Sequence, residues 1–225
     1  MSINVAHSEF AEQKGGLMIC GYEWGESKAD QAEGAGDSMG HTIDWNAVCT
    51  FANKNVRYGP RALTWAYDAR IRKWFGMWGF ELDTECPGPF EKSIVQTNWC
   101  DTQNHNMNGD YERLNDDDQV NNFLAHVDHF RPRMILFMGS QMIHALQRPA
   151  TIARFQSQMG QITNPLTFSQ KPFEGRRFRV AFQSFENCEV VCLPHPSGSH
   201  GLSDDYIDLF SSQIGALIAG AVNRI

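Results

Sequence analysis

Residues 17–25 have the sequence LMICGYEWG, a short apolar run that stops at a glycine and continues with polar and aromatic side chains. Three later segments follow the same plan, with an apolar run followed by polar or glycine-rich sequence. Runs of this length are typical of strands that are buried on both faces of a parallel sheet. The pattern predicts four buried strands, at residues 17–20, 93–96, 134–138 and 190–193.

A fifth segment alternates between basic and apolar side chains. Residues 177–183 have the sequence RFRVAFQ, so that an extended chain would present one apolar face and one basic face. This alternation indicates an additional strand at the edge of the sheet.

Helical patterns lie between the predicted strands. Apolar side chains recur at helical spacing in residues 60–76, 117–130, 140–146 and 205–222. Strands that alternate with helices favour an α/β fold, here a three-layer α/β/α sandwich around a central, mostly parallel four-stranded sheet. Ligands bind such folds at the carboxyl ends of the strands. Residues 27–46 contain few large apolar side chains and are predicted to form a long lid or substrate-binding loop.

Composition and charge set limits on the class of protein. The chain has 225 residues, of which 42% are hydrophobic and 20% charged, and residues 1–225 are expected to form a single domain. The N-terminus has no signal-peptide pattern and no stretch of about 18 apolar residues occurs, so a cytoplasmic protein without membrane contact is expected. The formal net charge of −7 argues against a broad basic face that clamps duplex DNA, but a grip on a few phosphates remains compatible with it.

The six cysteines are scattered and form no C-x-x-C pair. This pattern fits reduced thiols better than a disulfide framework or a zinc site. We therefore expect no metal and no cofactor.

Three groups of polar residues follow predicted strands. Glu23 comes after Gly21 and Tyr22, Asn98 follows the second strand, and His195 and Ser197 lie in a loop rich in proline and glycine after the fourth. Each has a simpler explanation when taken alone, namely a turn glycine, a turn-forming asparagine and a surface histidine. An asparagine nevertheless offers the donor and the acceptor that match the O4 and N3–H edge of uracil. A fixed histidine can donate to a carbonyl or a developing anion.

Together, these stretches resemble the uracil-DNA glycosylase superfamily. Its first motif is a strand followed by a glycine and a short water-activating segment, the place that GYEWG (21–25) takes here. VQTNWC (95–100) resembles the Asn-x-Cys form of the single-strand-selective branch, and PRMILFMGS (132–140) resembles a strand-to-helix segment of the superfamily. HPSG (195–198) combines elements of two closing motifs. The resemblance covers residues 16–214 and implies a uracil-DNA glycosylase-like fold.

The resemblance implies a role for each matching residue. Asn98 would bind the Watson–Crick edge of an extruded base, and His195 would stabilise the negative charge that grows on its O2. Glu23 would orient and activate the attacking water. Phe51 resembles the aromatic that stacks on the base, although a core aromatic fits nearly as well. The implied catalytic residues are Glu23 and His195, and the implied base-binding residues are Gly21, Tyr22, Phe51, Asn98 and Ser197.

Several positions depart from the superfamily pattern. Trp24 replaces a usual proline, and Glu23 is one methylene longer than the Asp that it would replace, which puts the water position in doubt. Ser199 occupies the place of an intercalating leucine. Leu202 lies three residues further on and is a candidate wedge between bases, while a simple loop is the alternative. The candidate DNA contacts are therefore Ser199, His200 and Leu202. Carboxylates, at residues 204–205, stand where phosphate-binding residues would be expected.

The leading hypothesis is a DNA glycosylase, a hydrolase of DNA repair that excises uracil or a related damaged base. One alternative is a non-catalytic protein that binds a nucleobase or nucleic acid in the same pocket. A small-metabolite enzyme on this fold is another. The expected partner is single- or double-stranded DNA, or a free nucleobase or nucleoside, and the protein is expected to be a monomer. Six basic residues are candidates for phosphate contacts, with a solvated basic face as the alternative: Arg131, Arg133, Lys171, Arg176, Arg177 and Arg179.

Overall fold

The computed structural model describes residues 14–25, 64–104, 107, 109–175 and 177–222. The predicted loop at residues 27–46, the beginning of the predicted helix at residues 60–63, and Phe51 lie outside these described residues.

A six-stranded mixed sheet forms the centre of the fold, in the strand order β3-β1-β5-β8-β7-β6. The first four strands in this order are parallel, and β7 and β6 continue the sheet in antiparallel fashion. The four predicted buried strands are confirmed, but the prediction of a four-stranded sheet was wrong by two strands. The strands are β1 (Leu17–Gly21), β3 (Ile94–Asn98), β5 (Met134–Met138), β6 (Ile162–Ser169), β7 (Val180–Phe185) and β8 (Glu189–Leu193).

Strand β6 was not predicted, and its presence moves residues 177–183 away from the edge of the sheet. Its residues are largely exposed and it contains Pro165, so it has no apolar run that would indicate a strand. It forms because β7 offers a free edge with which it pairs. The segment predicted as an edge strand, residues 177–183, therefore lies largely in β7, an inner strand between β8 and β6.

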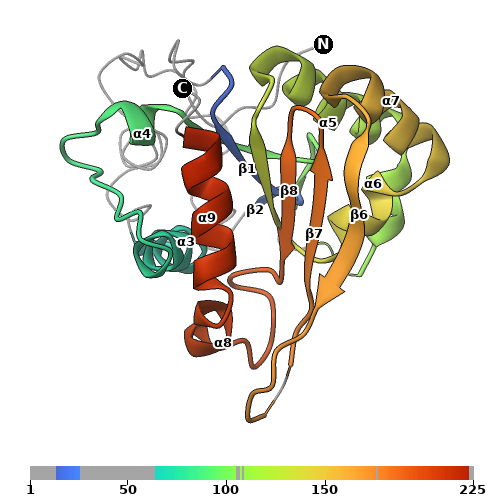
Figure 1. The fold of residues 1–225 in the computed structure, drawn as a ribbon. Helices are drawn as coiled ribbons and strands as arrows, with labels where there is room; N and C mark the ends of the chain where they lie inside the picture. The colour runs from blue at the N-terminus through green and yellow to red at the C-terminus, as the bar shows by residue number, and fades with distance from the viewer. Residues whose placement is uncertain (1–13, 26–63, 105–106, 108, 176, 223–225) are drawn as a thin grey trace, which may run out of the picture.

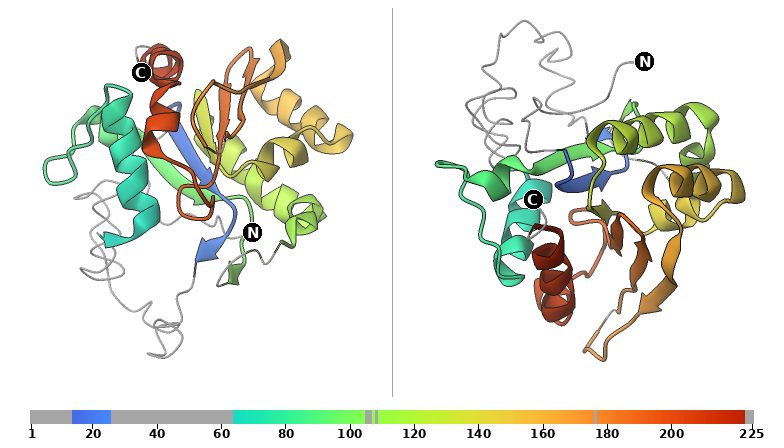
Figure 2. Two further views of the ribbon diagram at one scale, coloured as in Figure 1. Left: turned by 90° about the horizontal axis from the view of Figure 1, so that it is seen from below. Right: turned by 45° about the horizontal axis from the view of Figure 1, so that its top comes forward.

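Helices cover both faces of the sheet, so that the molecule has three layers (Figures 1 and 2). Alternate residues of β1 point to opposite layers: Met18 packs in the core under one layer and Ile19 in the core under the other. One layer consists of α5 (Asp117–Phe130), α6 (Gln141–Leu146) and α7 (Pro149–Met159). The other consists of α3 (Ala66–Met77), α8 (Asp204–Asp208) and α9 (Ser211–Val222).

The helix predictions were confirmed to different extents. Helix α5 has the predicted bounds, 117–130. The predicted helix at residues 205–222 is divided into α8 and α9, with the buried side chain of Phe210 at the break. Helix α7 was not predicted. Among the described residues, none of the helices combines the length and apolar character needed to cross a membrane.

Short elements complete the edge where the parallel strands end. Beyond β1 and β3, strand β2 (Trp24–Gly25) pairs in parallel with β4 (Gln103–Asn104). A 3₁₀ helix, η5 (Tyr111–Asn115), precedes α5, and α4 (Pro89–Lys92) precedes β3. The residues that follow β1, β3 and β8 thus meet at one edge, where α/β folds bind their ligands.

Candidate functional site

The side chain of Asn98 lies at the carboxyl end of β3 beside Gly21, its register partner at the end of β1. A Cβ atom added to Gly21 would come within 2.5 Å of Asn98 Oδ1, so only glycine leaves room for this amide. Asn98 is 8% exposed, and its amide forms no hydrogen bond with the other described residues. A buried amide normally has partners. Its donor and its acceptor are therefore available to a ligand.

The backbone around Asn98 is held firmly. The Asn122 amide donates to the Asn98 carbonyl oxygen at 3.3 Å and to that of Trp99 at 2.8 Å. The Trp99 N–H donates to the Gly21 carbonyl oxygen at 2.8 Å, which continues the pairing of the two strands. The Asn98 side chain is thus presented by a rigid strand end, a suitable base for a binding group.

His195 is held in one tautomer by its own loop. Its Nδ1 accepts a hydrogen bond from the Gly198 N–H at 2.8 Å, and Ser197 Oγ lies 3.4 Å from the same nitrogen. Burial lowers the pKa of His195 to about 4, so the ring is neutral near pH 7. With Nδ1 acting as an acceptor, the proton of the neutral ring is on Nε2. His195 therefore offers Nε2–H as a neutral hydrogen-bond donor.

Two tyrosines fix the plane of the His195 ring. The Tyr22 ring stacks on it at 5.8 Å between centroids with an interplanar angle of 5°, and the Tyr67 ring lies 5.3 Å away at 43°. Tyr22 itself packs over Gly139, and its hydroxyl accepts a hydrogen bond from the Gln141 N–H at 3.0 Å. Burial is the main cause of a raised pKa at both tyrosine hydroxyls, so both are neutral donors.

Tyr67, in α3, is a site residue that sequence reasoning missed. Its hydroxyl would lie 3.2 Å from a Cβ added to Gly21, so it borders the same space as the Asn98 amide. Tyr67 therefore connects the Asn98 side of the site with the His195 side. No motif marked it, since a single aromatic in a helix is usually a core residue. Only the contact between α3 and the strand ends reveals its place.

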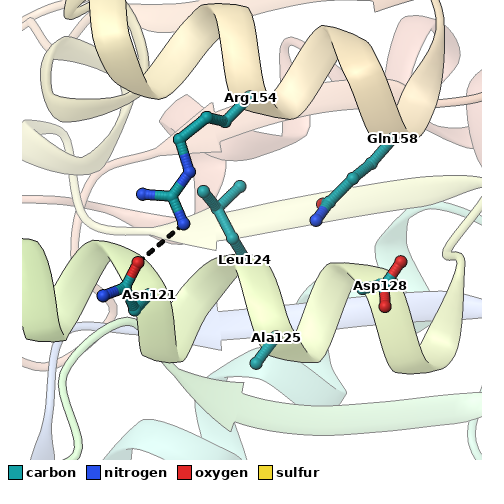
Figure 3. Close-up of a pocket in the computed structure, with 6 residues that line it drawn as sticks. All are labelled: Asn121, Leu124, Ala125, Asp128, Arg154 and Gln158. Atoms are coloured by element: carbon teal, nitrogen blue, oxygen red, sulfur yellow. Dashed lines mark hydrogen bonds between the residues drawn. The ribbon is translucent and has the colours of Figure 1, made fainter.

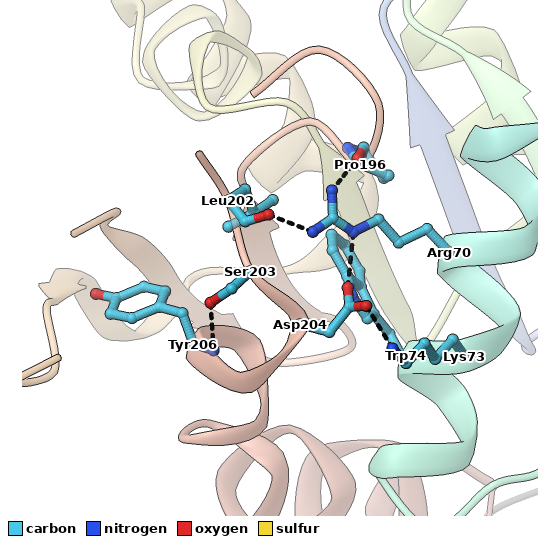
Figure 4. A network of polar contacts seen from close by, with 8 residues as sticks. All are labelled: Arg70, Lys73, Trp74, Pro196, Leu202, Ser203, Asp204 and Tyr206. Atoms are coloured by element: carbon cyan, nitrogen blue, oxygen red, sulfur yellow. Dashed lines mark hydrogen bonds and ion pairs between the residues drawn. The ribbon is translucent and has the colours of Figure 1, made fainter. Parts of the chain in front are cut away.

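Helix α3 also anchors the loop that carries His195 (Figure 4). The Arg70 guanidinium donates to the carbonyl oxygens of Pro196, at 2.7 Å, and of Leu202, and it forms an ion pair with Asp204 at 2.7 Å. Lys73 and Trp74 donate to the same carboxylate, at 2.6 and 2.9 Å. The loop is therefore fastened at both of its ends to one helix.

Asp204 is a structural anchor on this loop. Its partial burial opposes ionisation, but the hydrogen bonds from Lys73, Arg70 and Trp74 outweigh that effect and lower its pKa to about 2. Its carboxylate is directed toward α3. The repulsion of phosphates that its position in the sequence suggested is therefore offset by two neighbouring cations.

The candidate DNA contacts in this loop have different environments. His200 is exposed and Ser199 half-buried, so both can meet a ligand at the surface. Leu202 is 6% exposed and packs in the core beneath α8 and α9. A wedge role for Leu202 would require its side chain to leave the core that it fills here.

Glu23 lies beyond β1, toward η5. Its Oε2 accepts a hydrogen bond from Thr102 Oγ1 at 2.8 Å and forms an ion pair with Arg113 at 3.3 Å. The carboxylate is 4% exposed and held on the side of the edge where β3 ends. It shares this edge with His195, but no contact connects the two side chains among the described residues.

The structure therefore brings together most of the predicted site. Gly21 and Asn98 lie side by side, Tyr22 stacks on His195, and Tyr67 lies near both Gly21 and His195, with Ser197 exposed in the His195 loop. Phe51 lies outside the described residues, so its predicted stacking role stays a prediction.

One cavity lies away from these residues. About 320 Å³ in volume, it lies in the groove between α5 and α7, where Arg154 donates to Asn121 (Figure 3), and none of the candidate residues lines it. A cavity of about 150 Å³ lies nearer the site and is lined in part by Tyr111 and Gln141, which both contact Tyr22. The chemistry therefore favours the strand ends over the cavity between α5 and α7.

Within the described part of the chain, no three histidine, cysteine or acidic side chains are grouped in a way that could hold a metal ion. No known protein-family model matches this chain, and no curated protein is significantly similar to it in sequence. Function must therefore be argued from the site itself.

Proposed function

We propose that the protein is a DNA glycosylase that hydrolyses the N-glycosidic bond of uracil or a related damaged base. One observation carries this proposal: the buried Asn98 amide, without a partner among the described residues, lies at the same edge as the neutral Nε2–H of His195. An amide can donate to O4 of uracil and accept from its N3–H, which is the pairing that defines this base edge. The fold proposed with this function is the uracil-DNA glycosylase-like sandwich.

Bond cleavage in this proposal depends on His195. As the bond between C1′ and N1 breaks, its electron pair moves into the base and negative charge spreads to O2. Nε2–H then donates a hydrogen bond to O2 and stabilises that charge. A neutral donor is suited to this task because it needs no proton from solvent, and the stacked Tyr22 ring holds it in place before the substrate arrives.

Water completes the reaction in this proposal. It adds to C1′ of the sugar and loses a proton, which the Glu23 carboxylate accepts. Thr102 and Arg113 fix the position of that carboxylate, so its second oxygen would have to face the water in the complex with DNA.

The same contacts favour a second candidate function. A carboxylate already engaged by a hydroxyl and a guanidinium is less available to a water molecule. A protein that binds a nucleobase through Asn98 and His195 without cleaving its bond would keep this arrangement. Activity that depends on Glu23 separates the two functions.

The test is release of free uracil from single-stranded and duplex oligonucleotides that contain it. We expect Glu23→Gln and His195→Ala each to lower the rate by about a hundredfold, the scale of general-base and oxyanion assistance. Asn121→Ala, in the groove between α5 and α7, is the control and should leave the rate unchanged. Thermal unfolding establishes that all variants are folded.

Absence of release by the wild-type protein from either substrate would overturn excision of uracil. Calorimetric binding of free uracil, lost in Asn98→Ala but kept in Asn121→Ala, would then support the binding function. Release that is insensitive to Glu23→Gln would remove that residue from the mechanism.

A further inference from the structure

The hairpin that connects β6 to β7, residues 170–179, is strongly basic, although the chain as a whole is acidic. Its sequence is QKPFEGRRFR, with four cations and one carboxylate, so its formal charge is +3, whereas the whole chain has −7. The hairpin extends beyond the sheet on the side where β8 ends and the His195 loop begins (Figure 1). Positive charge is therefore concentrated beside the candidate site.

Tyr206 of α8 fastens both arms of this hairpin. Its hydroxyl accepts a hydrogen bond from the Lys171 N–H at 3.2 Å and donates one to the Phe178 carbonyl oxygen. Its ring also packs edge-on against Phe173 at 5.5 Å between centroids. Helix α8 directly follows the His195 loop, and Ser203 at the end of that loop caps it. One segment thus positions both the hairpin and His195.

Residues 177–180, from the end of the hairpin into β7, alternate between exposed cationic side chains and apolar side chains that pack in the core. Phe178 and Val180 turn toward the core, whereas Arg177 and Arg179 are exposed. The Arg179 guanidinium lies 5.0 Å over the ring of Phe168, an aromatic that is 41% exposed. The Arg177 Nε donates to the Phe173 carbonyl oxygen at 3.2 Å. Both guanidinium groups are therefore held on the outer face of the hairpin.

These two arginines differ from four others in the structure. Arg70, Arg113, Arg131 and Arg148 each form an ion pair with a carboxylate. Arg177 and Arg179 form none among the described residues. A guanidinium that lacks an internal counterion is available to an external anion, and its planar donors match the oxygens of a phosphate.

We infer that this hairpin binds the phosphate backbone of the DNA strand whose base enters the site. The inference rests on the proposed function, since the position of the hairpin matters only if the ligand is a strand and not a free base. DNA also explains the exposed Phe168, because aromatic rings beside cations can stack on bases. Contact with a few phosphates is compatible with a chain of net negative charge.

The test measures binding of fluorescent oligonucleotides that contain no uracil, single-stranded in one arm and duplex in the other, by anisotropy across a salt series. The variant is Arg177→Gln with Arg179→Gln. The control is Arg148→Gln with Arg154→Gln, which removes the same charge from exposed positions at the N-cap of α7 and within this helix. Thermal unfolding compares the folded state of both.

We expect the hairpin variant to bind about tenfold more weakly, while the control binds like the wild type. The slope of log affinity against log salt should fall by about 1.4 for single strands, since each of two lost phosphate contacts contributes about 0.7. Charge reversal to glutamate at both positions should weaken binding further. The oligonucleotide, single-stranded or duplex, whose affinity the hairpin variant lowers more is the form of DNA that the hairpin contacts.

Each outcome separates this inference from the proposed function. Equal affinities and slopes for the hairpin variant and the control would overturn the inference, as would absence of oligonucleotide binding by the wild type. Because the probe contains no uracil, hairpin-dependent binding supports the inference even if uracil release fails and the proposed glycosylase activity is lost. Uracil release that persists in the hairpin variant with unchanged dependence on oligonucleotide concentration would also contradict it.

Discussion

The parallel and antiparallel halves of the sheet differ in burial and in the kind of side chain that they present. The parallel strands β3, β1 and β5 are buried along their whole length, and polar chemistry gathers only where the parallel strands end. The antiparallel β6 is largely exposed, and the hairpin that follows it carries cations on its surface. The comparison shows that rigid burial positions the few groups that would touch a base, whereas an exposed edge can present charge without disturbing the core.

The largest effect on stability should distinguish these halves directly. Ile19 is fully buried in β1, whereas Ile162 is 38% exposed in β6. Ile19→Ala should lower the free energy of unfolding by about 2–5 kcal/mol, because it leaves a cavity between the sheet and a helix layer. Ile162→Ala should change it by only about 0.5 kcal/mol. Urea unfolding of both variants measures the difference, and similar losses would contradict the comparison.

A smaller effect should follow from releasing the His195 loop. Asp204→Asn should lower the free energy of unfolding by about 1–2 kcal/mol near pH 7, since it removes the ion pairs with Arg70 and Lys73. The pKa of Asp204 is about 2 in the folded protein, below its ordinary value of 3.8, so the stabilisation is present above pH 3.8 and is lost as the pH falls toward 2. The melting temperatures of the wild type and of Asp204→Asn should therefore converge as the pH falls across this range. Asp205→Asn, at an exposed neighbour, is the control.

Two glycine-to-alanine substitutions, one beside Asn98 and one in α3, test the role of Asn98 in binding. Gly21→Ala would force Asn98 Oδ1 to move, because the new Cβ would lie 2.5 Å from it. Affinity for uracil should fall about tenfold, while stability decreases by about 1 kcal/mol. Gly76→Ala, in α3, has no atom within 4 Å of the added Cβ and should stabilise by about 0.5–1 kcal/mol. Retained affinity in Gly21→Ala would argue against the Asn98 role.

A further effect concerns the protonation of His195. Its pKa is about 4 when folded, below the ordinary 6.5, so the unfolded chain binds more protons between these values. Stability is therefore complete above pH 6.5 and falls as the pH drops toward 4. Urea unfolding near pH 7 and pH 5 should show a loss for the wild type that is about 1 kcal/mol larger than for His195→Gln. Equal losses would mean that the ring is not held neutral.

Sequence reasoning succeeded where a local pattern is enough to identify an element. The four apolar runs became parallel strands, and residues 117–130 became α5. It failed at β6, whose exposed residues form a strand only because β7 supplies hydrogen-bonding partners. It also failed at the 205–222 segment, which the structure divides into α8 and α9 although Phe210 between them is buried with the rest of the stripe.

Some features of the candidate site could likewise be predicted from local sequence, and others could not. The sequence alone placed Asn98 and His195 at one edge, because parallel strands end on the same side of their sheet. Tertiary structure decided the tautomer of His195, the inclusion of Tyr67, the engagement of Glu23 by Arg113 and the burial of Leu202. Glu23 and Arg113 are 90 residues apart, and Arg70 and Asp204 are 134 apart. Local patterns specify which residues end a strand, but the partners of those residues depend on contacts that exist only once the chain has folded.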